Sequence, residues 1–164
     1  MQNFLNMIEI HHRLLKEVSA KAQQAPRQRM NYNFHTEMSD PLHRMLNALE
    51  PGTYVRPHKH ENPDKMESFI ILQGKILVII FSEKGEITHH CILEHESGNY
   101  GVEIPPRTYH SIIALAPGSV VYEVKNGPYS PADDKNFAPW APEEGSPEAK
   151  KYLNKLLKQL NFII

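Results

Sequence analysis

The stretch from Gly52 to Gly74 reads GTYVRPHKHENPDKMESFIILQG and places two histidines one residue apart, ahead of an apolar segment. Side chains alternate between the two faces of an extended strand, so Arg56, His58 and His60 are expected to point the same way. Glu67 begins the apolar segment. A carboxylate on that next strand can converge with the two imidazoles on one cation. The stretch therefore predicts three ligands of a metal site.

A fourth ligand candidate, His110, follows the turn residues Pro105-Pro106. Together with His58, His60 and Glu67 it predicts a site for one divalent transition metal. Three neutral imidazoles and one carboxylate suit iron, manganese, nickel, cobalt or zinc. Octahedral coordination would leave positions open for a substrate, dioxygen or water, whereas a fully ligated tetrahedral zinc would be structural. The residue pattern leaves both outcomes open.

The composition is that of one globular domain. The chain has 164 residues, of which 40% are hydrophobic and 23% charged, and its formal net charge of −1 gives no general electrostatic case for nucleic acid or an anionic membrane as partner. A lone cysteine, Cys91, excludes an intrachain disulfide and fits a reducing compartment. The sequence shows no long apolar run and no secretory signal pattern. We therefore expect a cytoplasmic protein.

Seven short apolar segments follow one another after Gly52, with turn residues between them. This spacing predicts an antiparallel sandwich or small barrel instead of alternating strand–helix units. The segment 76–81 is apolar without alternation, which is typical of a strand covered on both faces. The expected strands are 53–57, 67–72, 75–81, 86–93, 101–104, 110–114 and 119–125.

The flanks of this region have different patterns. Residues 3–25 have apolar groups at helical spacing, and we expect a helix packed on the core, with a lid or a homodimer contact as the alternative. Residues 42–49 fit a helix or a strand. The Pro-rich segment 127–145 is expected to be ordered, because its aromatic residues need a surface to pack on. Ser146-Pro147 then begins a closing helix. The predicted division is 1–26, 27–126 and 127–164.

A second group of coordinating residues occurs in the segment 88–95, where alternation would put His89, Cys91 and His95 on one strand face. A second metal or a nucleophilic thiol is one interpretation. No basic residue nearby would activate the thiol, and Leu93 interrupts the face. The favoured interpretation is an edge strand with mixed polar residues.

The spacing of Gly52, His58-x-His60, Glu67 and Gly74 resembles the first motif of the cupin superfamily, and Gly98 through Pro105 to His110 resembles the second. This sequence departs from those motifs in a longer gap before Glu67, and in Arg107 and Ala114 at positions that usually hold glycine and asparagine. The resemblance implies a mainly β fold: a single cupin jelly-roll barrel, or double-stranded β-helix, with flanking helices. It also implies a metal in the barrel.

More specifically, the chain is similar to the WbuC-type cupin-fold metalloproteins, which are often found beside surface-polysaccharide genes. The matching phrases are Tyr54–His60, Glu67–Phe69, Ile104–Pro106 with Tyr109–Ser111, Glu123–Tyr129 and Asp134–Gly145. The last two lie outside the general cupin motifs. This resemblance implies a fold and a metal more firmly than it implies a reaction.

A ligand site is expected beside the metal. Arg56 and Lys125 are candidates for binding a carboxylate or phosphate, and Tyr54 for an acid–base or stacking contact; salt bridges at the barrel rim are the alternative. Tyr109 is expected to face the other way and to pack. The expected function is a metal-dependent enzyme acting on a small polar or anionic molecule, such as a sugar or sugar phosphate. A non-catalytic sensing module and a structural cupin are the alternatives.

Overall fold

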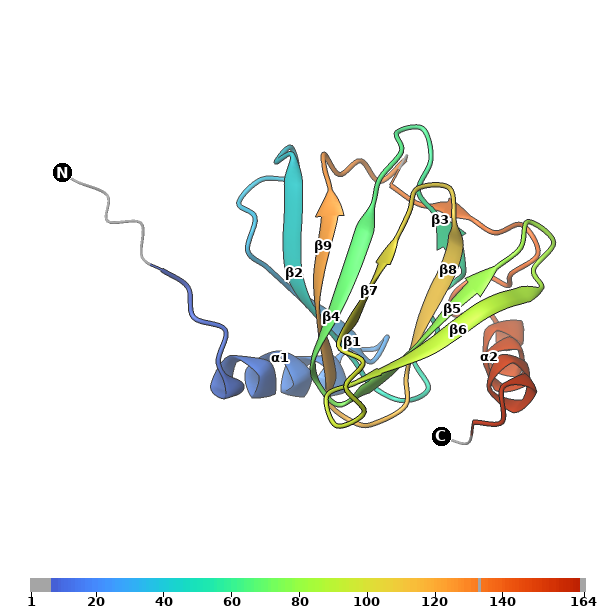
Figure 1. Cartoon of the computed structure of the whole chain (residues 1–164), viewed down its shortest axis with the longest axis horizontal. Coiled ribbons are helices and arrows are strands. Elements are labelled where there is room, and N and C mark those ends of the chain that lie inside the picture. The colour runs from blue at the N-terminus through green and yellow to red at the C-terminus, as the bar shows by residue number, and fades with distance from the viewer. Residues whose placement is uncertain (1–6, 133, 163–164) are drawn as a thin grey trace.

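The computed structural model describes residues 7–132 and 134–162, which form two five-stranded antiparallel sheets and two helices (Figure 1). The first sheet has the order β1-β2-β9-β4-β7 and the second the order β10-β3-β8-β5-β6. The first contains β1 (Arg29–Asn33), β2 (Leu42–Leu49), β9 (Ser119–Asn126), β4 (Glu67–Gln73) and β7 (Gly101–Ile104). The second contains β10 (Asn136–Phe137), β3 (His58–Lys59), β8 (Tyr109–Ala114), β5 (Lys75–Phe81) and β6 (Ile87–Glu94).

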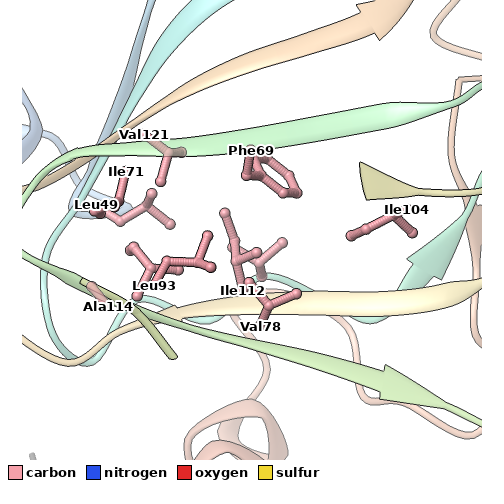
Figure 2. Close-up of a cluster of buried hydrophobic side chains, with 11 residues drawn as sticks. Leu49, Phe69, Ile71, Val78, Leu93, Ile104, Ile112, Ala114 and Val121 are labelled. Atoms are coloured by element: carbon pink, nitrogen blue, oxygen red, sulfur yellow. The ribbon is translucent and has the colours of Figure 1, made fainter. Parts of the chain in front are cut away.

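Apolar side chains from both sheets meet in the space between them (Figure 2). Leu49, Phe69 and Ile71 come from the first sheet, and Val78 and Ile112 from the second. Burial of such side chains is the main favourable contribution to folding. The predicted jelly-roll barrel with flanking helices is thus confirmed. The pattern of β5 is also explained, because Val78 faces this core while Leu77 and Ile79 belong to a second cluster on the outer face.

A helix covers the outer face of each sheet, and Figure 1 shows the two helices on opposite sides of the barrel. The helix α1 (His12–Gln24) buries Leu15, Val18 and Ala22 against Leu46 and Ala48 of β2. On the other side, the helix α2 (Pro147–Gln159) buries Leu153, Leu156 and Leu157 against the outer face of β5 and β8. Both helices are amphipathic, as their sequences predict. Neither they nor any other helix in the described part has the length and apolarity for crossing a bilayer.

One predicted strand is wrong, and one predicted helix begins later than expected. Residues 53–57 are extended but form no strand, because side chains satisfy their backbone: Arg29 donates to the Tyr54 carbonyl, and Glu144 accepts from the Arg56 amide. The strand begins only at His58. The first helix begins at His12, since the ring of His11 caps it by accepting from the Leu14 amide. Residues 3–6 of the predicted helix lie outside the described part of the chain.

The strands β1 and β2 could not be predicted from the pattern. The segment 42–49 is β2, a strand paired on both sides, by β1 and β9. The strand β1 went unrecognised because Arg29–Asn33 is polar at most positions. It lies at the edge of its sheet, where it pairs only with β2.

Gly74 makes the tight connection between β4 and β5 possible. Its φ of +77° lies in the left-handed region, and a Cβ at this position would come within 2.5 Å of the Ser119 hydroxyl oxygen. Glycine is the residue that accepts both conditions without strain. The backbone geometry of this turn therefore requires a glycine at the end of the stretch from Gly52 to Gly74.

The Pro-rich segment after β9 is packed against the barrel, as predicted. The ring of Trp140 lies 5.2 Å from that of Phe81 and 5.7 Å from that of Tyr109, measured between centroids, and its Nε1 donates to the Glu83 carbonyl. Tyr109 is buried in this outer cluster, which confirms that it faces away from His110. Glu144 fixes the end of the segment by accepting from Arg29 at 2.7 Å.

We expect Glu144→Gln to make the protein less stable only above acidic pH. Burial alone raises the pKa of Glu144, but the hydrogen bond and charge of Arg29 outweigh it and hold that pKa below its usual range. A carboxyl whose folded pKa is depressed adds stability above its unfolded pKa and loses it as the pH falls through the folded value. The variant should lose about 1–2 kcal/mol at neutral pH, and this deficit should disappear as the pH falls through the depressed pKa of Glu144.

Urea unfolding across a pH series measures this difference. Glu143→Gln is the matched control, because Glu143 is the exposed neighbour of Glu144. A Glu144→Gln deficit that persisted unchanged into acid would show that the Glu144 charge does not stabilise the segment.

Candidate metal centre

Three strand ends bring the four predicted ligands together. In the second sheet, His58 of β3 lies directly opposite His110 of β8 in the register of the two strands. His60 follows β3 immediately, and Glu67 is the first residue of β4 in the other sheet. Their ligand atoms all lie within 4.8 Å of one another, and each side chain is at most 4% exposed. The two sheets therefore contribute imidazoles and a carboxylate to one point inside the barrel.

Backbone carbonyls fix the orientation of all three rings. The Nδ1 atoms of His58 and His110 lie 2.9 Å from the carbonyl oxygens of Arg56 and Thr108, and Nδ1 of His60 contacts the Asp134 carbonyl. A carbonyl only accepts, so each Nδ1 carries a proton, and in the neutral ring Nε2 keeps its lone pair. This arrangement is typical of metal-ligating histidines, whose second nitrogen is held by an outer partner.

The Nε2 atoms of His110 and His60 lie near the same carboxylate oxygen of Glu67, at 2.8 and 3.5 Å. Nε2 of His60 is buried and has no hydrogen-bond partner among the described residues. Lone pairs of neutral imidazoles repel a carboxylate, so the arrangement requires positive charge between them. A cation or additional protons on the rings would supply it.

The pKa shifts favour the metal-binding forms of two of these groups. Burial lowers the pKa of His58 well below its usual value, which keeps the ring neutral. Burial on its own raises the pKa of Glu67, but hydrogen bonds to His110 and His60 and the charge of Lys125 outweigh it and hold that pKa well below its usual range. Neutral imidazole and ionised carboxylate are the states that bind a metal.

A cavity of about 430 Å³ lies between the first sheet and the segment after β9. None of the four ligand candidates lines it, but Lys125, which does, lies opposite Glu67 in the register of β9 and β4. Lys125 and Glu123 of β9 line it from one side, and Lys135 and Phe137 from the other. Burial and the nearby Glu67 raise the pKa of Glu123 to about 8. The volume falls within the range of small-molecule sites.

The three predicted ligand-contact residues have protein partners. Lys125 lines the cavity, but its Nζ donates to Asp134 at 2.7 Å. Arg56 donates to the Ala138 carbonyl at 3.3 Å, and its guanidinium lies 5.0 Å from the centre of the Phe137 ring. Tyr54 donates its hydroxyl hydrogen to the Pro142 carbonyl. Arg56 and Tyr54 thus hold the cavity wall in place, and ligand contact by all three residues stays a prediction.

Sequence reasoning missed the ionic group behind the site. Asp134 accepts from Lys65 at 2.8 Å and from Lys125 at 2.7 Å, and all three side chains are buried. Of the three, Lys65 and Asp134 belong to no periodic pattern, because Lys65 lies in the gap before Glu67 and Asp134 in the Pro-rich segment. The available signal was the phrase 134–145, whose resemblance to known sequences extends beyond the barrel motifs.

The second coordinating group predicted from sequence forms no cluster among the described residues. The strand β6 is the edge of its sheet, as the favoured interpretation required, and His89 and His95 are exposed. Burial raises the pKa of the Cys91 thiol, which disfavours the reactive thiolate.

Comparison with solved structures places the fold among known proteins. KdgF from Halomonas sp. has a TM-score of 0.50 at 20% identity, over 65% of this chain and 84% of that one. An L-ribose isomerase from Cellulomonas parahominis has a TM-score of 0.54 at 16% identity, over 74% and 72%. CapF, a capsular polysaccharide assembling protein from Staphylococcus aureus, has a TM-score of 0.52 at 21% identity, over 66% of this chain and only 31% of CapF.

These likenesses and the two-sheet barrel define a protein with the cupin fold. The chain belongs to the family described as Domain of unknown function (DUF6016), whose model matches residues 10–93. No curated protein matches it significantly.

Proposed function

We propose that this protein is a metal-binding cupin, with His58, His60, Glu67 and His110 as ligands of one divalent transition metal. One observation carries the proposal: three buried rings are fixed through Nδ1 to backbone carbonyls, which leaves each Nε2 for a site shared with a carboxylate. The donor set suits iron, manganese, nickel, cobalt or zinc. A bound metal would supply Lewis-acid polarisation of a ligand oxygen.

The ligand that we propose is a small polar molecule in the cavity beside the metal, specifically a sugar or sugar phosphate. Two observations support this class: the cavity has a suitable volume, and amide and charged side chains line it. The WbuC-type phrases and the fold shared with a capsular polysaccharide assembling protein support a setting in surface-polysaccharide metabolism. The free thiol of Cys91 fits a reducing compartment such as the cytoplasm.

Catalysis is favoured over simple binding by the placement of Glu123. Its carboxyl group lines the cavity, where it can exchange a proton with a ligand held there. Proton exchange with a bound ligand is what an isomerase requires. A non-catalytic metabolite-binding module is the second candidate, because Lys125 and Arg56 are already engaged by protein groups.

Metal-loaded protein and chelator-treated protein should differ in their activity toward a panel of hexose 6-phosphates. We expect the metal-loaded protein to convert at least one of these sugar phosphates and the chelator-treated protein to be inactive. Proton NMR measures the conversion. Metal-dependent binding without conversion in calorimetry would select the non-catalytic module. Neither binding nor conversion by the loaded protein would contradict the proposed ligand class.

A further inference from the structure

The inward faces of two strands change from apolar to polar along their length. On β2, Leu49 belongs to the core, and Asn47 and His43 lie on the same face two and six residues earlier. On β9, Val121 belongs to the core, and Glu123 and Lys125 follow on its face. The polar ends of both strands line the cavity. Inward positions of a barrel are normally apolar, so the polar end requires a separate explanation.

The edge strand β1 completes this polar surface. Arg29, Asn31 and Asn33 alternate onto one face of β1, and the register places Asn31 opposite Asn47. All four line the cavity. Side-chain amides both donate and accept, and hydroxyl groups have the same two capacities. Asn47 donates to Glu123 and Asn31 to the Met45 sulfur, but Oδ1 of Asn47 is buried without a hydrogen-bond partner among the described residues. The remaining amide groups are therefore suited to a ligand with several hydroxyls.

Most charged groups of the cavity form ion pairs. Asp134 is shared by Lys65 and Lys125, and Glu144 holds Arg29. Lys135 also lines the cavity, but its ammonium forms no hydrogen bond or ion pair with any described residue. Burial lowers the pKa of Lys135, and the carboxylates of Glu67 and Glu123 oppose that effect. A partly buried cation without a hydrogen-bonded counter-ion among the described residues is costly, and a ligand anion in the cavity would offset that cost.

We propose that Lys135 binds the anionic group, carboxylate or phosphate, of a polyhydroxylated ligand whose hydroxyls contact Asn31, Asn33 and Asn47. The ligand extends from the metal across the cavity, because Glu67 lies opposite Lys125 in the register of β4 and β9. This assignment rests on the proposed function and narrows it, since neutral sugars lack the group that Lys135 binds.

Calorimetry on the metal-loaded full chain tests the charge requirement with three probes: D-gluconate, D-glucose 6-phosphate and D-glucose. At least one anionic probe should bind at least about 10-fold more tightly than glucose. Tighter binding of gluconate would identify the group as a carboxylate, and tighter binding of glucose 6-phosphate would identify it as a phosphate. Equal affinity for glucose, or no binding of either anion, would overturn the inference.

The variant Lys135→Met identifies the residue responsible. It should weaken the preferred anion by about 10- to 100-fold while metal content stays at the wild-type level. Its melting temperature without ligand should be equal to or above that of the wild type, because an unpaired partly buried charge is removed. Lys150→Met, on the exposed face of α2, is the matched control and should change neither quantity.

Two further results bear on the assignment. Asn33→Ala should weaken gluconate by about 2- to 10-fold, the effect of one neutral hydrogen bond. Unchanged anion affinity in Lys135→Met, or a large fall in its melting temperature, would overturn the inference and leave the metal site standing. Wild-type protein that takes up no metal would instead overturn the proposed function.

Discussion

Alanine at both His58 and His110 is expected to leave the protein without bound transition metal. These residues face each other across β3 and β8, so the double variant removes two of the four donors at the centre of the site. Loss of a residue that only hydrogen-bonds a metal ligand typically lowers metal affinity 10- to 100-fold. Loss of two ligands themselves should therefore lower the affinity by more than about 100-fold. Elemental mass spectrometry of purified, untagged protein measures the content directly.

Thermal unfolding with and without a chelator provides the second measurement for this variant. A metal that binds only the folded state stabilises it by about 4 kcal/mol at a free concentration a thousandfold above Kd. The wild type should therefore lose stability on chelation, and the double variant should not respond. His89→Ala with His90→Ala, two exposed histidines of β6, should behave as wild type. Full metal content in the His58 and His110 double variant would refute the ligand assignment.

The second large effect is expected for Asp134→Asn. Asp134 is 2% exposed and pairs with Lys65 and Lys125, which are 2% and 5% exposed. The substitution keeps the size of the side chain but leaves two buried ammonium groups without their counter-ion. Removing one partner of a buried pair costs about 3–5 kcal/mol. We expect a loss of this size in the free energy of unfolding.

Urea unfolding at neutral pH measures that loss. Asp64→Asn is the control, because Asp64 forms an ion pair with Arg107 in which both side chains are largely exposed. Exposed pairs contribute little, so the control should remain close to wild type. Equal stability of the two variants would show that the lysines do not depend on Asp134.

The ligand candidates could be predicted from sequence because neighbours along the chain decide their geometry. His58 and His60 are two residues apart, and both Glu67 and His110 occur where an apolar segment begins. Such positions fall at strand ends, and strand ends of a barrel come together at its mouth. The fold could be predicted for the same reason, since turn residues separated most of the strands.

The cavity could not be predicted, because its contacts join segments that are far apart in sequence. The pairing of Asp134 with Lys65 spans 69 residues, and the register of Asn31 with Asn47 depends on a strand with no apolar alternation. Alternation placed Arg56 near the site. It gave no information on the carbonyl of Ala138 and the ring of Phe137, which engage its side chain.

Anomalous diffraction from crystals of untagged protein tests the metal centre most directly. The account predicts a single strong peak between the Nε2 atoms of His58, His60 and His110 and the carboxylate of Glu67, with an absorption edge that identifies the element. Crystals grown with added iron, manganese, nickel, cobalt or zinc that showed no peak at this point would contradict it.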